Sequence, residues 1–139
     1  MALTVVDAAA QFAFAIHEEL TRAAATQGLS VTQLRVLGIL RDRTPSMADI
    51  ADRLGLDRSS VTGLIDRAAA RGLVERAPSP HDARVVTVRL TEAGRSVGAE
   101  LERDAEGRIA HLLRNVPAEE RAALVRTVPL LRRGSESSP

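Results

Sequence analysis

The chain has 139 residues, the length of one domain with a modest hydrophobic core, and it contains no cysteine, which excludes disulfides, thiolate metal sites and thiol-based redox sensing. No segment approaches the ~20 apolar residues of a membrane-spanning helix, and no basic segment precedes the apolar N-terminus as in a signal peptide, so we expect a cytoplasmic protein with no membrane partner. The formal net charge is +1, but residues 35–95 carry eleven Arg against eight acidic residues. This excess suits a nucleic-acid partner, and ordinary variation in charge along the chain is the alternative.

The first predicted helix, about residues 5–25, has apolar side chains on two faces. One stripe at helical spacing consists of Val5, Ala9, Phe12, Ile16 and Leu20. Phe14 lies roughly 200° around the helix from Phe12, at about 100° per residue, so the opposite face is apolar too. Since both faces must be covered, we expect one to pack on the chain's own domain and the other on a second subunit. A monomer with a small terminal subdomain is the alternative.

Capping signals predict three further helices, over about residues 30–42, 46–54 and 57–71. Capping boxes begin at Ser30 and Ser46, and Asp57 caps the third of these helices. Gly72 ends that helix, because glycine readily adopts the left-handed conformation that follows a helix C-terminus.

The second and third of these helices have the spacing of a helix-turn-helix. Ala51 is small enough for two helices to approach closely, and Gly55 suits the tight turn between them. Val61 is the inward-facing residue of the following helix. The apolar positions around these three are Ile50, Leu54, Leu56 and Leu64. A helix-turn-helix followed by a β-hairpin wing is a DNA-binding module.

A β-hairpin is predicted directly after this unit, in residues 73–91. Apolar and polar residues alternate over 86–90 at the period of a strand, and the turn contains Pro, His, Asp and Arg. Thr91 caps a long helix that we expect to run to about Val116. The apolar stripe of this helix, which matches that of the first helix, consists of Val97, Leu101, Ala105, Ile109, Leu112 and Val116.

The last predicted helix begins at Pro117, which suits a first turn, and ends near Arg133. Pro129 is expected to interrupt or kink it. The tail, residues 134–139, is expected to be disordered.

The fold class that follows is mainly α with a small β-hairpin wing (α+β), as one domain over residues 1–139. We expect a winged helix-turn-helix lobe over about residues 30–94. The terminal segments, about residues 5–25 and 95–133, would form a helical dimerisation region.

In the order of its elements and in three motifs, the chain resembles the MarR family of bacterial transcriptional regulators. The motifs are GLSVTQLRVLGIL, SMADIADRLGLDRSSVTGLIDRAAARGLVER and SPHDARVVTVRLTEAG. The third carries the family's Asp-x-Arg wing tip and its Leu-Thr-x-x-Gly, here Asp82, Arg84, Leu90, Thr91 and Gly94. The resemblance implies a triangular homodimer, usually a repressor, that is often released from DNA by a small phenolic or other lipophilic ligand.

The recognition helix presents an outward strip at helical spacing, which fits a major groove. The strip consists of Arg58, Ser59, Thr62, Gly63, Asp66 and Arg67. Arg58 and Arg67 are candidates for guanine recognition. Ser59 and Thr62 can donate to phosphates or base edges, and Gly63 permits close approach to DNA. An ordinary solvated helix face is the alternative.

Two further residues of this helix have predicted roles. Asp66 would repel a phosphate, so we expect it to orient an arginine. Ser60 lies near the helix start, where backbone N–H groups and the helix dipole favour a phosphate.

At the predicted wing, Arg84 would enter the minor groove, where negative potential is concentrated. Asp82 would accept from its guanidinium and hold it in place. Arg76 and Arg89 on the strands are candidates for flanking phosphates. Two such lobes related by a two-fold axis would read a pseudo-palindromic operator with half-sites ~34–36 Å apart, and the many phosphate contacts would make binding strongly salt-dependent.

For an effector, the family resemblance points to a site between the dimerisation helices and the DNA-binding lobe. The candidates there are Phe12, Phe14, His17, Arg35 and Leu101. They would suit a small lipophilic or anionic effector, with Arg35 or His17 contacting an anion. The chain has no Trp or Tyr and only two Phe, so core or surface roles remain the alternative for each.

Metal sites, cofactors and enzyme chemistry are not expected. The three histidines lie on different predicted elements without close ligand spacing. The sequence has no Gly-rich phosphate loop and no nucleophile elbow. A winged-helix module for protein–protein contact, without specific DNA binding, is the alternative to a DNA-binding regulator.

Overall fold

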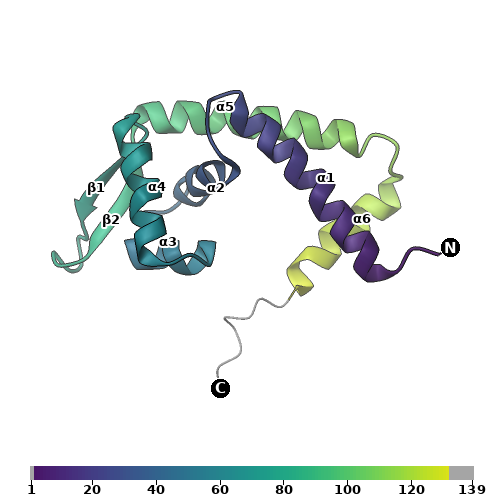
Figure 1. Ribbon diagram of the computed structural model, residues 1–139, viewed down its shortest axis with the longest axis horizontal. Helices are drawn as coiled ribbons and strands as arrows, with labels where there is room; N and C mark the ends of the chain where they lie inside the picture. The colour runs from purple at the N-terminus through teal and green to yellow at the C-terminus, as the bar shows by residue number, and fades with distance from the viewer. Residues whose placement is uncertain (1, 132–139) are drawn as a thin grey trace, which may run out of the picture.

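The computed structural model describes residues 2–131. Its elements in chain order are α1 (Val5–Ala25), α2 (Val31–Leu40), α3 (Met47–Leu54), α4 (Arg58–Ala70), β1 (Val74–Pro78), β2 (Val86–Leu90), α5 (Glu92–Leu112), α6 (Ala118–Thr127) and a 3-10 turn η1 (Val128–Leu130). The molecule is elongated, with α5 running along its length (Figure 1). The hairpin and α2–α4 form a lobe at one end of α5, and α1 and α6 lie toward the other end (Figure 1). This is the predicted α+β class.

The hydrophobic core lies between α2, α3 and α4 and under the hairpin. Its largest fully buried side chains are Leu40, Ile50, Ile65, Val36, Val61 and Val88. Ala24 from α1 and Leu101 from α5 join the same cluster, so both long helices are anchored to the lobe by apolar packing. Residues that stand at helical or strand spacing in the sequence thus meet in one core.

The helix boundaries follow the predicted caps. Ser30 and Ser46 form complete capping boxes, and the Asp57 carboxylate accepts a backbone N–H at the start of α4. Gly55 has φ 66° at the end of α3 and Gly72 has φ 73° after α4, a conformation that costs glycine little because it lacks a Cβ. The tight turn of the helix-turn-helix is therefore confirmed at Gly55.

The hairpin is joined to the α2–α3 connection along the outer edge of β2. β1 and β2 pair in antiparallel register, with Glu75 opposite Arg89. On the edge of β2 that faces away from β1, the Val88 N–H donates to the Pro45 carbonyl at 2.9 Å, and Ser46 forms an isolated β-bridge with Thr87. The α2–α3 connection therefore serves as a third, very short strand that fixes the wing on the helix-turn-helix.

The start of α5 is packed tightly against the start of the hairpin. The Thr91 N–H donates to the Leu73 carbonyl at 3.0 Å, and the Thr91 hydroxyl donates to the Gly72 carbonyl at 2.5 Å. A Cβ placed on Gly94 would lie 1.9 Å from the Leu73 carbonyl oxygen. Glycine is required there because the two backbones approach more closely than any side chain allows.

Polar contacts tie α1 and α2 to α5. The Glu19 carboxylate lies 3.9 Å from Arg108, and Arg41, which follows α2, pairs with Glu102 at 2.7 Å. The Gln27 amide in the α1–α2 turn donates to Glu100 at 2.8 Å. The Glu19–Arg108 contact is partly buried, whereas the other two are exposed and add little stability.

Two predicted helix ends need correction. The long helix ends at Leu112, before the expected Val116. In a continued helix Pro117 would lack the N–H that the Leu113 carbonyl needs and would clash with that carbonyl, and it also disfavours the helical conformation at Val116, so the chain turns over residues 113–116 instead. The last helix ends at Thr127, where Pro129 interrupts it as predicted and a 3-10 turn follows. Its expected continuation to Arg133 and the predicted disorder of residues 134–139 lie outside the described residues.

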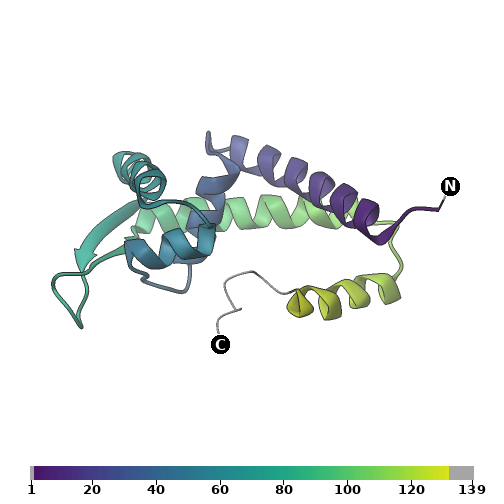
Figure 2. The same cartoon turned by 60° about the horizontal axis from the view of Figure 1, so that its bottom comes forward.

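The terminal helices leave much apolar surface uncovered. α6 doubles back below the far half of α5 (Figure 2) and has no buried residue. The exposed large apolar side chains at the two ends of the chain are Leu3, Val5, Val6, Phe12, Phe14, Leu112, Val125, Val128, Leu130 and Leu131. None of the helices in the described part is long and apolar enough to cross a membrane.

Candidate nucleic-acid interface

One side of α4 packs into the core and the other faces solvent. Val61 and Ile65 are fully buried, and Leu64 and Ala68 are nearly so. The predicted outward strip is exposed at Arg58, Ser59, Thr62, Asp66 and Arg67 and half-buried at Gly63. The helix therefore presents the side chains that the sequence assigned to its outer face.

The start of α4 differs from the sequence expectation at Ser60. Its backbone N–H donates to the Asp57 carboxylate at 2.8 Å, and the Ser59 hydroxyl donates to the same oxygen at 2.7 Å. These hydrogen bonds, of which the one from the Ser59 hydroxyl has the largest effect, lower the pKa of Asp57 below its usual value. The Ser60 amide is thus occupied by the protein's own carboxylate, which leaves the exposed Ser60 hydroxyl as the group that can meet a phosphate.

Two other residues of the strip are engaged within the helix. The Thr62 hydroxyl donates to the Arg58 carbonyl at 2.9 Å, so in this conformation it offers an acceptor to a ligand. The position that a Cβ on Gly63 would take lies 3.2 Å from an Arg67 guanidinium nitrogen. The missing side chain therefore lets Arg67 lie along the helix surface.

Asp66 connects the recognition helix to the wing. Its carboxylate accepts from the Arg76 guanidinium of β1 at 2.5 Å, and that Asp66 orients this arginine for DNA stays a prediction. Arg89 of β2 pairs with Glu75 directly across the hairpin at 2.7 Å. Both strand arginines are thus held by carboxylates of the protein.

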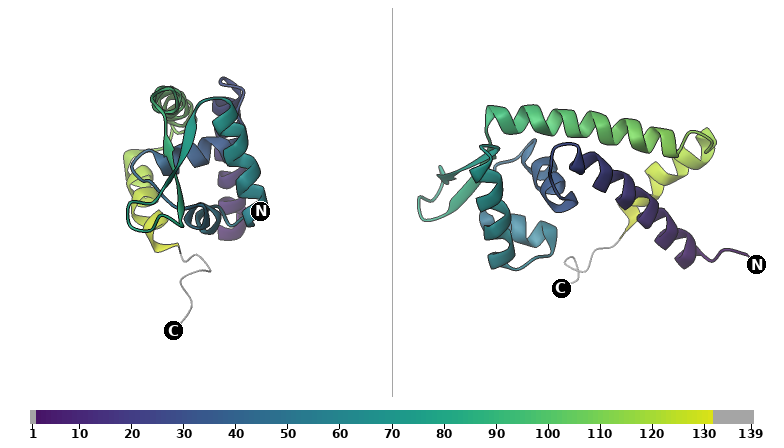
Figure 3. Two further views of the ribbon diagram at one scale, coloured as in Figure 1. Left: turned by 90° about the vertical axis from the view of Figure 1, so that its left-hand side faces the viewer. Right: turned by 45° about the horizontal axis from the view of Figure 1, so that its top comes forward.

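The wing tip holds its arginine by a two-point contact. The Arg84 guanidinium donates to the two Asp82 carboxylate oxygens at 3.1 and 3.2 Å, and the Arg84 backbone N–H donates at 3.0 Å. Both kinds of hydrogen bond lower the pKa of Asp82 below its usual value, and the one from the Arg84 side chain has the larger effect. The Arg84 side chain is nonetheless 90% exposed, at a hairpin tip that projects beyond α4 (Figure 3).

Sequence reasoning missed a groove beside the strip. It has a volume of about 500 Å³ and is lined by Ser30, Thr32, Leu56, Ser59, Ser60, Gly63, Leu64 and Arg67. Ser30 and Thr32 come from the start of α2, so the strip on α4 continues onto a second helix. From the sequence, Ser30 is recognised only as the first residue of a capping box. Nothing in the local sequence indicates that α2 lies beside α4.

Comparisons with known proteins fit this architecture. Residues 27–85 match the family model described as MarR family. The chain is 32% identical over 111 residues to the HTH-type transcriptional regulator YfiV of Bacillus subtilis, and the match covers 79% of this chain and 69% of YfiV.

The chain belongs to the MarR family of transcriptional regulators.

Further likenesses to transcriptional regulators extend over most of the chain. The transcriptional activatory protein BadR of Rhodopseudomonas palustris is 37% identical over 91 residues, which are 63% of this chain and 52% of BadR. The repressor CouR bound to a 23-mer DNA duplex superposes with a TM-score of 0.81 at 25% identity, covering 94% of this chain and 93% of CouR. CouR from Rhodococcus jostii has also been solved bound to p-coumaroyl-CoA, and it superposes with a TM-score of 0.80 at 23% identity, over 92% of each chain.

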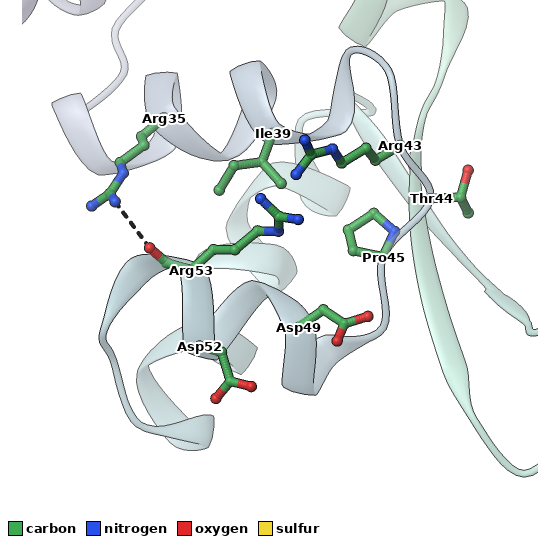
Figure 4. Close-up of a pocket in the computed structure, with 8 residues that line it drawn as sticks. All are labelled: Arg35, Ile39, Arg43, Thr44, Pro45, Asp49, Asp52 and Arg53. Atoms are coloured by element: carbon green, nitrogen blue, oxygen red, sulfur yellow. Dashed lines mark hydrogen bonds between the residues drawn. The ribbon is translucent and has the colours of Figure 1, made fainter. Parts of the chain in front are cut away.

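The effector candidates of this MarR-family chain do not converge. Arg35 lines a cleft between α2 and α3 and donates to the Arg53 carbonyl at 2.9 Å (Figure 4). Leu101 is buried and lines a separate cleft of about 520 Å³ between α2, β2 and α5. Phe12, Phe14 and His17 are exposed on α1 and line neither cleft. The sequence placed all five together because it could not show which side of α2 each would meet.

The three histidines lie far apart in the chain, on α1, in the hairpin turn and on α5. Within residues 2–131, no three His, Cys, Asp or Glu side chains gather closely enough to hold a metal ion.

Proposed function

We propose that this MarR-family regulator acts as a homodimeric repressor that binds a pseudo-palindromic operator in double-stranded DNA. The observation that carries this proposal is the combination of an exposed strip on α4 with an exposed arginine held at the wing tip. An exposed strip on a helix suits a major groove, and an exposed arginine at the wing tip suits the adjacent minor groove.

In this proposal α4 reads the major groove. Arg58 and Arg67 contact guanine edges, where a guanidinium can donate two hydrogen bonds. Ser59, Ser60 and Thr62 contact phosphates or bases through their hydroxyl groups, and Gly63 lets the helix approach closely. Thr32 and Ser30 add phosphate contacts from the start of α2.

The wing contributes in two ways. Arg84 enters the minor groove, and because Asp82 already holds its guanidinium, less side-chain entropy is lost on binding. Arg76 and Arg89 contact flanking phosphates while they remain paired with Asp66 and Glu75. Asp66 thereby sets the angle between the recognition helix and the wing.

The uncovered terminal helices support the homodimer. α6 has no buried residue, and a helix this short is only marginally stable without packing. Phe14 is 74% exposed and Leu130 is 77% exposed. A second copy of the chain that packs α1, α5 and α6 against their counterparts would cover this surface and set the spacing of the two lobes. The division into a lobe of about residues 30–94 and a dimerisation region of about residues 5–25 and 95–133 belongs to this proposal.

We also propose that a small lipophilic or anionic effector releases the protein from DNA. The cleft at Leu101 lies between the lobe and α5, where occupancy would change the angle between them. The CouR structure with p-coumaroyl-CoA supports an effector in a related fold. Phe12, Phe14, His17 and Arg35 remain candidates for contacts completed by the second subunit.

Fluorescence anisotropy tests the proposal directly. A labelled duplex from the intergenic region beside the gene is titrated with wild type, Arg84→Ala and the control Arg103→Ala, which removes an equal charge from the exposed side of α5. We expect Arg84→Ala to weaken binding by 1–3 kcal/mol, about 5- to 150-fold, and Arg103→Ala to bind as wild type does. Equal affinity of wild type and Arg84→Ala, or no preference over an unrelated duplex, would refute the proposal.

A further inference from the structure

A cleft of about 680 Å³ opens between α2 and α3, on a part of the lobe that the proposed DNA interface does not use. Its lining residues are Arg35, Ile39, Arg43, Thr44, Pro45, Asp49, Asp52 and Arg53. None of them comes from α4 or the hairpin. The volume is that of a site for a small molecule.

Three arginines from three segments of the chain border this cleft. Arg35 belongs to α2, Arg43 to the α2–α3 connection and Arg53 to α3 (Figure 4). The Arg35 side chain donates to the Arg53 carbonyl at 2.9 Å, which draws the two helices together. In the part of the chain that the structure describes, no carboxylate forms an ion pair with any of the three. Within residues 2–131 the cleft is thus lined by three arginines outside ion pairs and two carboxylates, a net positive lining.

The two carboxylates of the lining do not compete for the arginines. In Figure 4 the Arg43 and Arg53 guanidinium groups point toward one another beside Ile39, whereas the Asp49 and Asp52 carboxylates point away from them. Asp49 accepts the Ser46 N–H at 3.2 Å as part of the α3 capping box, so its orientation is fixed. The space beside Ile39 is thus bordered by two guanidinium groups, which are positively charged hydrogen-bond donors.

We propose that this cleft binds a small organic dianion, either a dicarboxylate or a phosphate monoester. A guanidinium group matches the geometry of a carboxylate or phosphate and can donate to it through two nitrogens. Arg43 and Arg53 bind the anionic group, and Arg35 binds the second charge or remains on the Arg53 carbonyl. Ile39 and the buried Pro45 provide an apolar wall for the carbon skeleton of the ligand.

The site adjoins the segment that supports the wing. Pro45 lines the cleft, and its carbonyl accepts the Val88 N–H of β2 at 2.9 Å. Ser46, the next residue, bridges Thr87. A ligand that draws Arg43 inward therefore acts on the connection to which β2 is attached. This regulatory consequence rests on the proposed DNA-binding function, whereas the binding site does not.

The binding test uses the free protein and needs no DNA. ¹⁵N-labelled wild type is titrated with succinate, glycerol 3-phosphate and inorganic phosphate at constant ionic strength, with succinamide and glycerol as neutral controls. We expect saturable shifts of the Thr44, Ser46 and Arg53 amides, with a smaller shift at Val88, for a dicarboxylate or a phosphate but not for the neutral compounds. The succinate and phosphate arms show which of the two anions the cleft prefers.

Substitutions decide whether the arginines form the site. Arg43→Gln and Arg53→Gln, each checked for native circular dichroism, are expected to weaken binding by about tenfold or more, because each removes charge-assisted hydrogen bonds. The matched control Arg103→Gln removes one charge elsewhere and is expected to bind as wild type does. No saturable shift with any anion, or an equal loss in Arg103→Gln, would overturn the proposal.

A DNA arm separates this proposal from the proposed function. Arg43→Gln and Arg53→Gln are expected to bind the operator duplex with wild-type affinity in the absence of the anion. If they lose as much DNA affinity as Arg58→Gln and no anion gives a saturable shift, the arginines serve DNA phosphates, and the anion site is refuted while the regulator is not. If wild type binds the anion but no DNA, the proposed function fails and the anion site stands.

Discussion

Replacing Gly94 with alanine tests the close contact between α5 and the hairpin. The added Cβ would lie 1.9 Å from the Leu73 carbonyl oxygen and 2.9 Å from its carbon, both backbone atoms that cannot rotate aside. Relief requires α5 to move by about 1 Å or more, since Cβ contacts below about 3 Å are essentially never seen. Such a movement strains the two bonds of Thr91 to the carbonyls of Gly72 and Leu73.

The expected cost follows from these terms. Overpacking of this kind costs ~1–3 kcal/mol, and weakening two hydrogen bonds adds ~1 kcal/mol each. The helix propensity of alanine returns ~1 kcal/mol. We therefore expect Gly94→Ala to lower the free energy of unfolding by roughly 2–4 kcal/mol. Urea denaturation followed by circular dichroism at 222 nm measures this, since the chain has no tryptophan.

A matched control lies one turn further along the same helix. A Cβ on Gly98 would have no heavy atom within 4 Å, so Gly98→Ala is expected to leave stability unchanged or raise it by up to ~1 kcal/mol. The two substitutions are chemically identical and differ only in the backbone that they meet. If Gly94→Ala proves as stable as Gly98→Ala, the described contact between α5 and the hairpin is wrong.

Three further predictions concern the cap, the dimer and the wing. Hydrogen bonds from Ser59 and Ser60 lower the folded-state pKa of Asp57. The ionised carboxylate therefore stabilises the fold fully above the unfolded Asp pKa of ~3.9, and this stabilisation is lost as the pH falls through the lower folded value. Asp57→Asn should make the free energy of unfolding less dependent on pH in this acid range, and an unchanged dependence would contradict this. Val125→Asp on α6 should convert a dimer to a monomer in light scattering, whereas Glu120→Ala should not; a dimer that survives Val125→Asp would place the interface elsewhere. Asp66→Asn, which leaves Arg76 without its carboxylate, should weaken DNA binding although it removes a negative charge, and a gain in affinity would show that Asp66 acts by repulsion alone.

The lobe was predictable because its signals are local. A capping box, a glycine after a helix and an inward-facing Val61 each need only a few neighbouring residues to specify them. The Asp82–Arg84 contact spans two residues and was predicted for the same reason. Helix ends also depend on local chemistry, and α5 ends at Leu112, before the predicted Val116, because Pro117 disrupts the whole turn that precedes it.

Contacts between distant segments were not predictable in the same way. Arg71 at the end of α4 donates to the Gln27 carbonyl at 2.8 Å, and Pro45 supports β2, yet no spacing in the sequence connects these pairs. The cleft at Arg35 and Arg53 likewise depends on how α2 packs against α3. A single sequence shows which residues lie on one face of a helix, but the packing decides which of two neighbouring faces opens a cleft.

Selection of bound duplexes from a random-sequence pool tests the central claim most directly, because the pool contains every candidate half-site and the protein itself chooses among them. A dimer with one α4 per half-site is expected to enrich a two-fold symmetric motif whose half-sites lie one helical turn, ~34–36 Å, apart. Arg58→Ala should relax the preference at one base pair in each half-site, and Arg84→Ala should weaken binding with little change in the motif. No enriched sequence, or an asymmetric motif that Arg58→Ala leaves unaltered, would contradict the account.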